Sequence, residues 1–246
     1  MFVFKTGLSI YKNDYKNIQN ILNNCNLSIK KIFSKNFIEG VKIINENSNL
    51  DTFFRINIDK NNSQIIFFEN ASLKFVQNFN FGTEIITNDI SKMIGLKNEM
   101  VKDILQNSDF TKDGLDSENI EEKFFNKVKY RKIRKNLILE IAKARIQEFS
   151  ELILTKNTNL NSFLRKEVSV FFNIKNRFNF KCLDENFKLY FSYGNKLKFN
   201  FLEESAFEDL YFNANSIVQY GWKKEAVPIV QEKKSLIARF FNIFSQ

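Results

Sequence analysis

The sequence contains no histidine among its 246 residues. This absence excludes Ser-His-Asp and Cys-His nucleophilic machinery and every metal motif that needs histidine. There are only two cysteines, Cys25 and Cys182. Two thiols cannot build a zinc or iron–sulfur site by themselves, and they are too few for a disulfide framework. We therefore expect a reducing compartment, no metal site and no enzymatic activity that depends on these groups.

Long apolar runs are also lacking. No stretch reaches the roughly 18 residues that a membrane-spanning helix needs. Met1–Phe4 begins without the charged region, apolar region and cleavage site that make a signal peptide. We expect a cytoplasmic protein.

Apolar and basic residues are abundant. Hydrophobic residues make up 43% of the chain, enough for a packed core, and 37 Lys and Arg against 28 Asp and Glu give a net charge of +9. Such a charge indicates nucleic acid or an anionic membrane as a partner, although a Lys-rich coding bias gives the same excess. The basic residues are scattered apart from one cluster: Lys127, Lys129, Arg131, Lys132, Arg134 and Lys135.

The first half of the chain predicts an alternating β/α pattern followed by strands. The periodicities predict strands at 2–10, 27–33, 52–58, 64–68 and 73–79, and helices at 14–24, 37–44, 83–94 and 98–106. Turn residues at Asp59–Asn62 and at Glu69 and Asn70 predict that the three strands after residue 51 are adjacent and antiparallel. In the helix over 83–94 we expect a buried stripe of Ile85, Ile86, Ile90 and Met93.

The second half predicts a long helix or helix pair over 118–156, with Leu137, Ile141, Phe149 and Ile153 at core spacing. Strands are expected at 168–172, 178–182, 188–193 and 196–201, and a last domain helix at 204–220. The fold class predicted is α/β, a mixed sheet flanked by helices.

The final residues, 233–246, predict a short amphipathic helix that lies on a membrane. Its apolar residues fall within an arc of roughly 160° at the helical period, and basic residues flank them. We expect the membrane-binding residues to be Lys233, Lys234, Leu236, Ile237, Arg239, Phe240, Phe241, Ile243 and Phe244. The alternative is that this helix packs back onto its own domain. One copy should bind an anionic surface weakly, whereas many copies on a polymer should bind firmly.

Three segments and the tail carry motifs of a known family. Asn57–Phe75 (NIDKNNSQIIFFENASLKF) is followed by Phe81–Ile90 (FGTEIITNDI), which ends in Thr-Asn-Asp-Ile, and Leu137–Ile153 (LILEIAKARIQEFSELI) contains an Ala-Arg-x-x-Glu pattern. These segments resemble, in order, the strand, phosphate loop and hairpin, the Thr-Asn-Asp-Ile segment and the Ala-Arg-x-x-Glu helix of the bacterial cell-division protein FtsA, a family of actin-like ATPases. The tail resembles the membrane anchor of that family. The resemblance implies an actin-like, ribonuclease H-like fold. It also implies four regions: 1–50, the end of a first actin-like subdomain; 51–222, a second actin-like domain; 223–232, a linker; and 233–246, the anchor.

The chain departs from the family at its nucleotide loops. The family binds ATP and magnesium through an Asp-Ile-Gly-Gly-Gly-Thr-Thr-Asp loop, and this chain has Asp59, Lys60 and Asn61 at the place of the glycines. Glycine lets main-chain N–H groups approach phosphate oxygens, and Asp59 adds a negative charge. A second family loop, Thr-Gly-Gly, is replaced by Asn173, Ile174 and Lys175. We expect no nucleotide cofactor, neither binding nor hydrolysis of ATP, and no enzymatic activity.

Partner residues are implied by the resemblance alone. In the family, the Arg and Glu of the Ala-Arg-x-x-Glu helix and an Arg fourteen positions upstream hold the C-terminal tail of FtsZ. The matching positions are Arg145, Glu148 and Arg131. A helix-surface Arg and Glu at this spacing can equally be a plain solvated pair.

The implied function is a scaffold at the division site, on the cytoplasmic face of the membrane, that tethers FtsZ filaments through the terminal helix. Its partners would be the FtsZ tail and the anionic inner-membrane surface, with self-association as a further candidate and no nucleic acid. Two alternatives stay open: a basic nucleic-acid-binding module using the Lys127–Lys135 cluster, and an actin-like ATPase that retains weak nucleotide binding. The sequence also leaves open whether the chain is a reduced protein or a fragment.

Overall fold

The structure is a computed structural model. It describes residues 12–29, 33–47, 49–110, 117–125, 129–160, 163, 168–175, 177–192, 194, 196–202 and 215. Three predicted elements lie outside the described residues: the strand at 2–10, nearly all of the helix at 204–220, and the amphipathic tail at 233–246.

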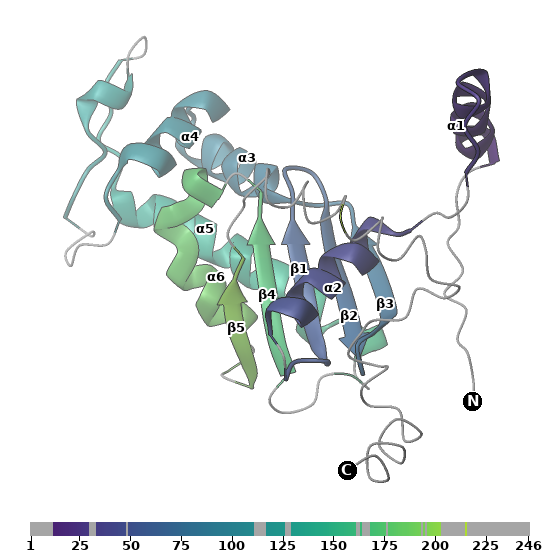
Figure 1. The fold of residues 1–246 in the computed structure, drawn as a ribbon. Helices are drawn as coiled ribbons and strands as arrows, with labels where there is room; N and C mark the ends of the chain where they lie inside the picture. The colour runs from purple at the N-terminus through teal and green to yellow at the C-terminus, as the bar shows by residue number, and fades with distance from the viewer. Residues whose placement is uncertain are drawn as a thin grey trace. The chain divides into compact units, whose positions relative to one another are not determined.

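Five strands form one mixed sheet with the order β3-β2-β1-β4-β5 (Figure 1). The strands are β1 (Phe53–Ile58), β2 (Ser63–Glu69), β3 (Ser72–Phe79), β4 (Val168–Ile174) and β5 (Leu197–Phe201). The helices are α1 (Lys12–Asn24), α2 (Lys35–Glu46), α3 (Thr83–Ile94), α4 (Asn98–Asn107), α5 (Lys135–Ser150) and α6 (Asp184–Phe191). Shorter turns of helix are Glu122–Phe125, Glu151–Thr155, Thr158–Leu160 and Arg177–Leu183. The predicted mixed sheet flanked by helices is confirmed.

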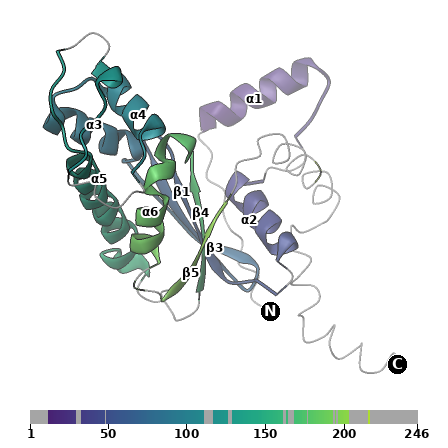
Figure 2. The same ribbon diagram turned by 90° about the vertical axis from the view of Figure 1, so that its left-hand side faces the viewer.

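The chain divides into two compact units. The first comprises Met1–Phe53, Ile66–Phe75 and Ser205–Gln246, and the second comprises Phe54–Ile65 and Val76–Glu204. In the second unit, α3, α4, α5 and α6 lie together on one face of the strands, as Figure 2 shows. In the first unit, α2 packs on β2, where Gly40 lies against the ring of Phe68.

Burial along each strand matches its place in the sheet. In β1, β2 and β4 almost every residue is buried, which is typical of central strands that are covered on both faces. The edge strand β3 instead alternates between half-buried and exposed residues over most of its length. At the β2–β3 turn, Asn70 and Ala71 have φ of 51° and 58°, the pair of positive angles that a two-residue hairpin favours.

The hairpin strands and four helices were predicted correctly, but three strand predictions were wrong. Residues 27–29 and Phe33 lie outside any strand, 178–182 belongs to the helical turn Arg177–Leu183, and 188–193 begins inside α6. Aromatic residues favour strands on average, yet tertiary packing overrides this preference. In α6, Phe187 and Phe191 lie one turn apart, both are fully buried, and their ring centroids are 5.6 and 4.7 Å from that of Phe172.

The long helix predicted over 118–156 is interrupted. Two short segments pair before α5 begins: the N–H of Ile120 donates to Ile133 O (2.8 Å), and the N–H of Lys135 donates to Glu118 O (2.9 Å). Buried Lys135 also forms an ion pair with Glu118, with Nζ 2.8 Å from Oε2. This non-local pairing holds residues 129–134 outside a helix.

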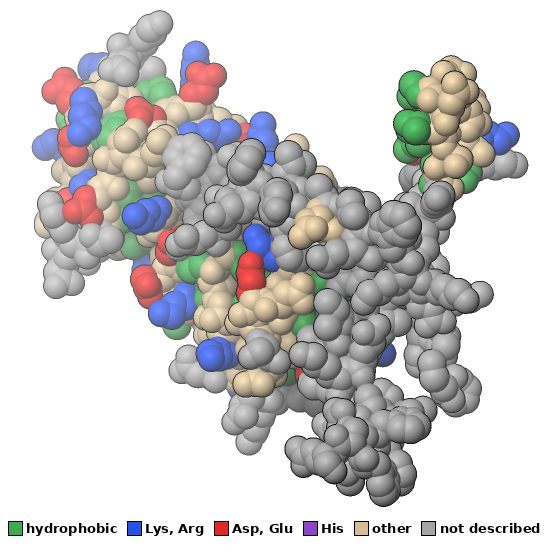
Figure 3. All heavy atoms as spheres, viewed as in Figure 1, with side chains coloured by type: hydrophobic (Ala, Val, Ile, Leu, Met, Phe, Trp, Pro, Cys, Tyr) green, Lys and Arg blue, Asp and Glu red, His purple; other side chains and the backbone are tan. Residues whose placement is uncertain are grey.

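Two residues predicted for the core are on the surface instead. Met93 is 68% exposed and Leu137 is 45% exposed, while Ile86, Ile90, Phe149 and Ile153 are buried as expected. On α1 the apolar side chains share one side, and Figure 3 shows them gathered there. Ile18 and Ile21 on α1 are 52% and 64% exposed.

A methyl group at Gly40 should destabilise the first unit. A Cβ built there would lie 2.0 Å from Phe68 Cζ, and Phe68 cannot retreat because it is fully buried and stacked on Phe53. We expect Gly40→Ala to lower the free energy of unfolding by about 1–3 kcal/mol in urea titrations. Asn45→Ala, at an exposed position of the same helix, is the matched control. Gly40→Ala combined with Phe68→Leu should recover part of the loss; equal stability of Gly40→Ala and the control would contradict the packing.

Candidate functional site

The turn between β1 and β2 is bonded to the start of α3. The N–H of Asp59 closes the turn on Asn62 O at 2.8 Å. The N–H groups of Thr83 and Glu84 donate to Asp59 O (3.0 Å) and Lys60 O (2.9 Å). The first turn of α3 therefore has two of its main-chain donors satisfied by the turn.

Gly82 makes this contact possible. A Cβ at Gly82 would lie 2.1 Å from Asp59 O, so any side chain would push the turn away from α3. The hydroxyl of Ser63 adds a further bond by donating to Phe81 O at 2.7 Å. The turn is thus held by the first residues of α3 and by the segment that precedes this helix.

These residues do not fit the phosphates of ATP. A phosphate loop offers several main-chain N–H groups in a glycine-lined concavity. Here the N–H of Asp59 is used within the turn, its carboxylate would repel a phosphate, and no glycine lies between Ile58 and Ser63. At the place of the second family loop, Ile174 ends β4 and the N–H of Lys175 donates to Ile58 O at 3.0 Å.

A cluster of three charged side chains lies between α3 and α5. Arg145 Nε donates to Asp89 Oδ2 at 2.7 Å, and its terminal nitrogens bond Asp89 and Glu148. The side chains remain 29%, 26% and 49% exposed for Arg145, Asp89 and Glu148, so a partner can reach them. Arg145 and Glu148 lie together as their spacing implied. Asp89 belongs to the Thr-Asn-Asp-Ile motif, but helical spacing alone could not show that it meets Arg145.

Arg131 is separate from this cluster. It lies in the extended segment before α5, and its guanidinium donates to Ile94 O (2.9 Å) and Gly95 O (3.0 Å). These are carbonyls at the end of α3, where Gly95 has a φ of 63° and closes the helix. A cation at this end also interacts favourably with the helix dipole. Arg131 thus acts as a cap of α3.

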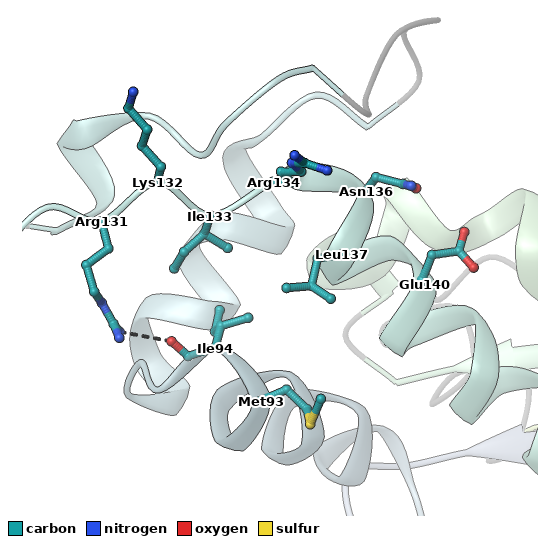
Figure 4. A pocket seen from close by; sticks show the side chains of 9 residues that line it. All are labelled: Met93, Ile94, Arg131, Lys132, Ile133, Arg134, Asn136, Leu137 and Glu140. Atoms are coloured by element: carbon teal, nitrogen blue, oxygen red, sulfur yellow. Dashed lines mark hydrogen bonds between the residues drawn. The ribbon is translucent and has the colours of Figure 1, made fainter.

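A groove opens beside Arg131, between the end of α3 and the start of α5 (Figure 4). Its volume is about 590 Å³, and its lining residues are Met93, Ile94, Arg131, Lys132, Ile133, Arg134, Asn136, Leu137 and Glu140. Arg145 and Glu148 are not among them. Met93 and Leu137, which the sequence predicted for the core, both line this groove. No sequence signal could have revealed it, because an apolar residue at helical spacing looks the same in a core and in a groove.

The basic cluster of the sequence is only partly available to a ligand. Lys135 is buried and paired with Glu118, and Arg131 is bonded to the end of α3. Lys129, Lys132 and Arg134 are exposed, and Lys127 lies outside the described residues.

We also considered a reactive cysteine, a metal site and a membrane-spanning helix in the described part of the chain. Burial raises the pKa of the Cys182 thiol to about 12, which keeps it protonated and poorly nucleophilic near neutral pH. Among the described residues, no three Cys, Asp or Glu side chains gather where they could hold a metal ion. None of the described helices is long and apolar enough to cross a membrane.

Sequence comparison gives no match to any protein-family profile, and none to a curated protein. Comparison of structures does find similarity. MreB5 of Spiroplasma citri bound to ADP superposes with a TM-score of 0.53 at 13% identity, over 94% of this chain and 69% of MreB5.

Two further structures are similar at lower scores. The ethanolamine utilization protein EutJ from Carboxydothermus hydrogenoformans has a TM-score of 0.45 at 8% identity, over 78% of this chain and 57% of EutJ. The apo ParM protein of pSK41 has a TM-score of 0.42 at 14% identity, over 82% of this chain and 48% of ParM. The chain thus spans about half to two thirds of these proteins. The match to MreB5 confirms the expected actin-like fold. At this low sequence identity the similarity concerns the fold alone.

Absence of nucleotide binding stays a prediction, and it can be tested directly. We expect isothermal titration of the full chain with ATP and magnesium to give no dissociation constant tighter than about 100 µM. The physical reason is the engaged, glycine-free turn after β1. Tighter binding would contradict this prediction, and a further gain in affinity in Asp59→Ala, which removes the repelling carboxylate, would then locate the phosphates at the turn.

Proposed function

We propose that this chain is a cell-division scaffold that tethers FtsZ filaments to the cytoplasmic face of the membrane. The single observation that carries the proposal is Arg145, which is held in a defined position on α5 by Asp89 and Glu148 yet stays partly exposed. An Arg fixed on a rigid helix is placed to make charge-assisted bonds to a carboxylate of a partner, which would exchange with the bonds that Arg145 makes to Asp89 and Glu148. The actin-like fold and the resemblance of the tail support the same function.

The tether needs no catalysis. One end of the chain grips the filament through the α5 surface, and residues 233–246 lay their apolar side chains into the inner leaflet with Lys and Arg facing phosphates. A single tail binds weakly, so the filament that gathers many copies supplies the avidity. We also expect the chain to bind the filament and the membrane without nucleotide, because the turn after β1 offers no place for phosphates.

A nucleic-acid-binding function is less well supported. Electrostatic binding of this kind uses several uncommitted Lys and Arg side chains on one surface. Two members of the basic cluster, Arg131 and Lys135, are already bonded within the fold.

Charge reversal at Arg145 should abolish binding of the FtsZ tail. We expect Arg145→Glu to weaken the affinity of the tail peptide about thirtyfold or more in fluorescence anisotropy, because the attraction between Arg145 and a carboxylate of the peptide is replaced by repulsion from Glu at this position and from the neighbouring Asp89 and Glu148. Lys143→Glu, two residues away on the same helix, is the matched control. Arg145→Ala should weaken binding without the added repulsion. Unaltered affinity in both Arg145 variants would refute the assignment.

The tail should carry membrane binding. We expect the full chain to sediment with anionic liposomes and the variant carrying Phe240→Glu and Phe241→Glu to stay in the supernatant, since the charged side chains cannot enter the apolar layer. The control carries Ser235→Glu and Asn242→Glu, the same charge change on the polar side of the helix. The anchor is wrong if both variants sediment alike, or if the unmodified chain does not sediment.

A further inference from the structure

Helix α1 carries an apolar stripe that the fold leaves exposed. At the helical period, its apolar side chains fall within an arc of roughly 120°. They are Tyr15, Ile18, Ile21 and Leu22. Tyr15, Ile18 and Ile21 are 36%, 52% and 64% exposed, and Figure 3 shows the apolar side chains gathered on one side of α1. Large apolar side chains that share an exposed face are typical of a contact surface.

The end of α1 adds a further apolar residue to this face. Asn26 has a φ of 56°, and the N–H of Leu27 donates back to Leu22 O at 2.9 Å. This arrangement closes a helix and holds the residue after the left-handed one beside the last turn. Leu27, which is 57% exposed, therefore extends the face. We call these five apolar residues of 15–27 the α1 stripe.

The rest of α1 is poorly suited to a membrane. Its polar side is mostly asparagine, and Lys12 and Lys16 are the only basic residues of the helix. Helices that lie on anionic membranes carry several Lys and Arg on that side. Asp14 lies at the N-terminal end of the stripe itself, where lipid phosphates would repel its carboxylate. The α1 stripe therefore suits an apolar protein segment better than a lipid surface.

The size of the stripe favours a segment of the same chain. With 13 residues, α1 is roughly 20 Å long and about 10 Å across. Stable complexes between separate proteins bury about 800 Å² from each partner, which is several times the area of this face. A segment of the same chain needs less area, because the covalent link keeps its effective concentration high.

The C-terminal residues 233–246 fit the stripe in shape and charge. The sequence predicts a helix there whose apolar arc is roughly 160° wide, with basic residues beside it. Those basic residues can pair with Asp14, the one acidic residue of α1. Residues 205–246 belong to the same compact unit as α1. The preceding residues 203–232 can extend over about 100 Å, which is long enough to allow the contact.

We propose that the apolar face of the terminal helix packs on the α1 stripe when the chain is free of the membrane. The tail side chains, among them Phe240 and Phe241, cannot cover the stripe and enter a lipid layer at the same time. Membrane and α1 therefore compete for the tail, and the apparent affinity for the membrane falls with the fraction of chains whose tail is free. The inference rests on the proposed function only for the membrane as the competitor.

This competition would make membrane binding depend on assembly. In a lone chain the tail packs on α1, so the chain stays in solution. A filament that gathers many copies presents many tails to the membrane at once, and their combined binding outweighs the contact with α1.

Cys25 reports whether the stripe is covered. It follows Ile21 by one helical turn and is exposed, whereas burial raises the pKa of the Cys182 thiol to about 12 and keeps it poorly reactive. The test measures alkylation of Cys25 by iodoacetamide in the full chain, followed by peptide mass spectrometry. We expect Phe240→Glu combined with Phe241→Glu to speed this reaction about threefold or more, because the altered tail no longer covers the stripe.

The matched control for the tail combines Ser235→Glu and Asn242→Glu, which add the same charge on its polar side. We expect this control to react like the unmodified chain and anionic liposomes to speed the reaction of the unmodified chain. Equal rates in all three chains would overturn the inference. Protection that persists in the Phe variant and grows with protein concentration would also overturn it, because a second copy would then cover the stripe. Liposomes that slow the reaction would overturn it as well, because lipid would then cover α1.

Loss of the stripe should strengthen membrane binding. We expect Ile18→Ser combined with Ile21→Ser to bind anionic liposomes about three- to tenfold more tightly, since the tail loses its docking site. The matched control combines Asn17→Ser and Asn20→Ser, which alter the polar side of the same helix and should leave binding unchanged. Urea unfolding checks that each variant is folded. A stripe variant that binds no more tightly than its control would contradict the competition.

The two measurements separate this inference from the membrane anchor. If no variant binds liposomes, the anchor is wrong, and the rates of Cys25 alkylation still decide whether the tail packs on α1. If liposomes bind the chain through Phe240 and Phe241 while these residues leave the Cys25 rate unchanged, the anchor stands and the α1 contact is wrong.

Discussion

Two main-chain hydrogen bonds join the β1–β2 turn to the first turn of α3, and the placement of the candidate sites depends on them. They position α3 beside the strands, and α3 contributes Asp89 to the charged cluster and Met93 to the groove. The bonds require close approach of two backbones, which only Gly82 allows at this point. The same contact shapes the turn into one that offers no cradle for a phosphate.

Two surface features of the second unit involve α5. Near the start of α5 lies the groove with its exposed apolar floor, and further along the helix lies Arg145 between two carboxylates. A helix is a suitable base for such groups because its side chains project from a rigid frame at fixed spacing. In the described part of the chain, neither feature contains three Cys, Asp or Glu side chains placed to hold a metal ion.

The ion pairs in this region differ in what they do. In the Lys135–Glu118 pair the lysine is buried and the glutamate is partly exposed, and the pair holds the extended segment against the start of α5, so it belongs to the fold. Arg131 likewise serves the end of α3. Arg145, Lys132 and Arg134 keep enough exposure to interact with another molecule. The sequence alone cannot distinguish charged side chains that hold the fold together from those that stay exposed, because their burial and their partners depend on residues far away in the chain.

The sequence by itself determined the local elements: the hairpin strands, their turns, and helices α1 to α4, since turn residues and apolar periodicity act over a few neighbours. It also determined the departure from nucleotide-binding loops, because a glycine is either present or absent. Only the tertiary structure decided that 184–191 is a helix, through the burial of Phe187 and Phe191 around Phe172. It alone placed Asp89 on Arg145, turned Arg131 into a cap, and brought Met93 and Leu137 to one groove. These outcomes depend on contacts between segments far apart in sequence, which no local pattern encodes.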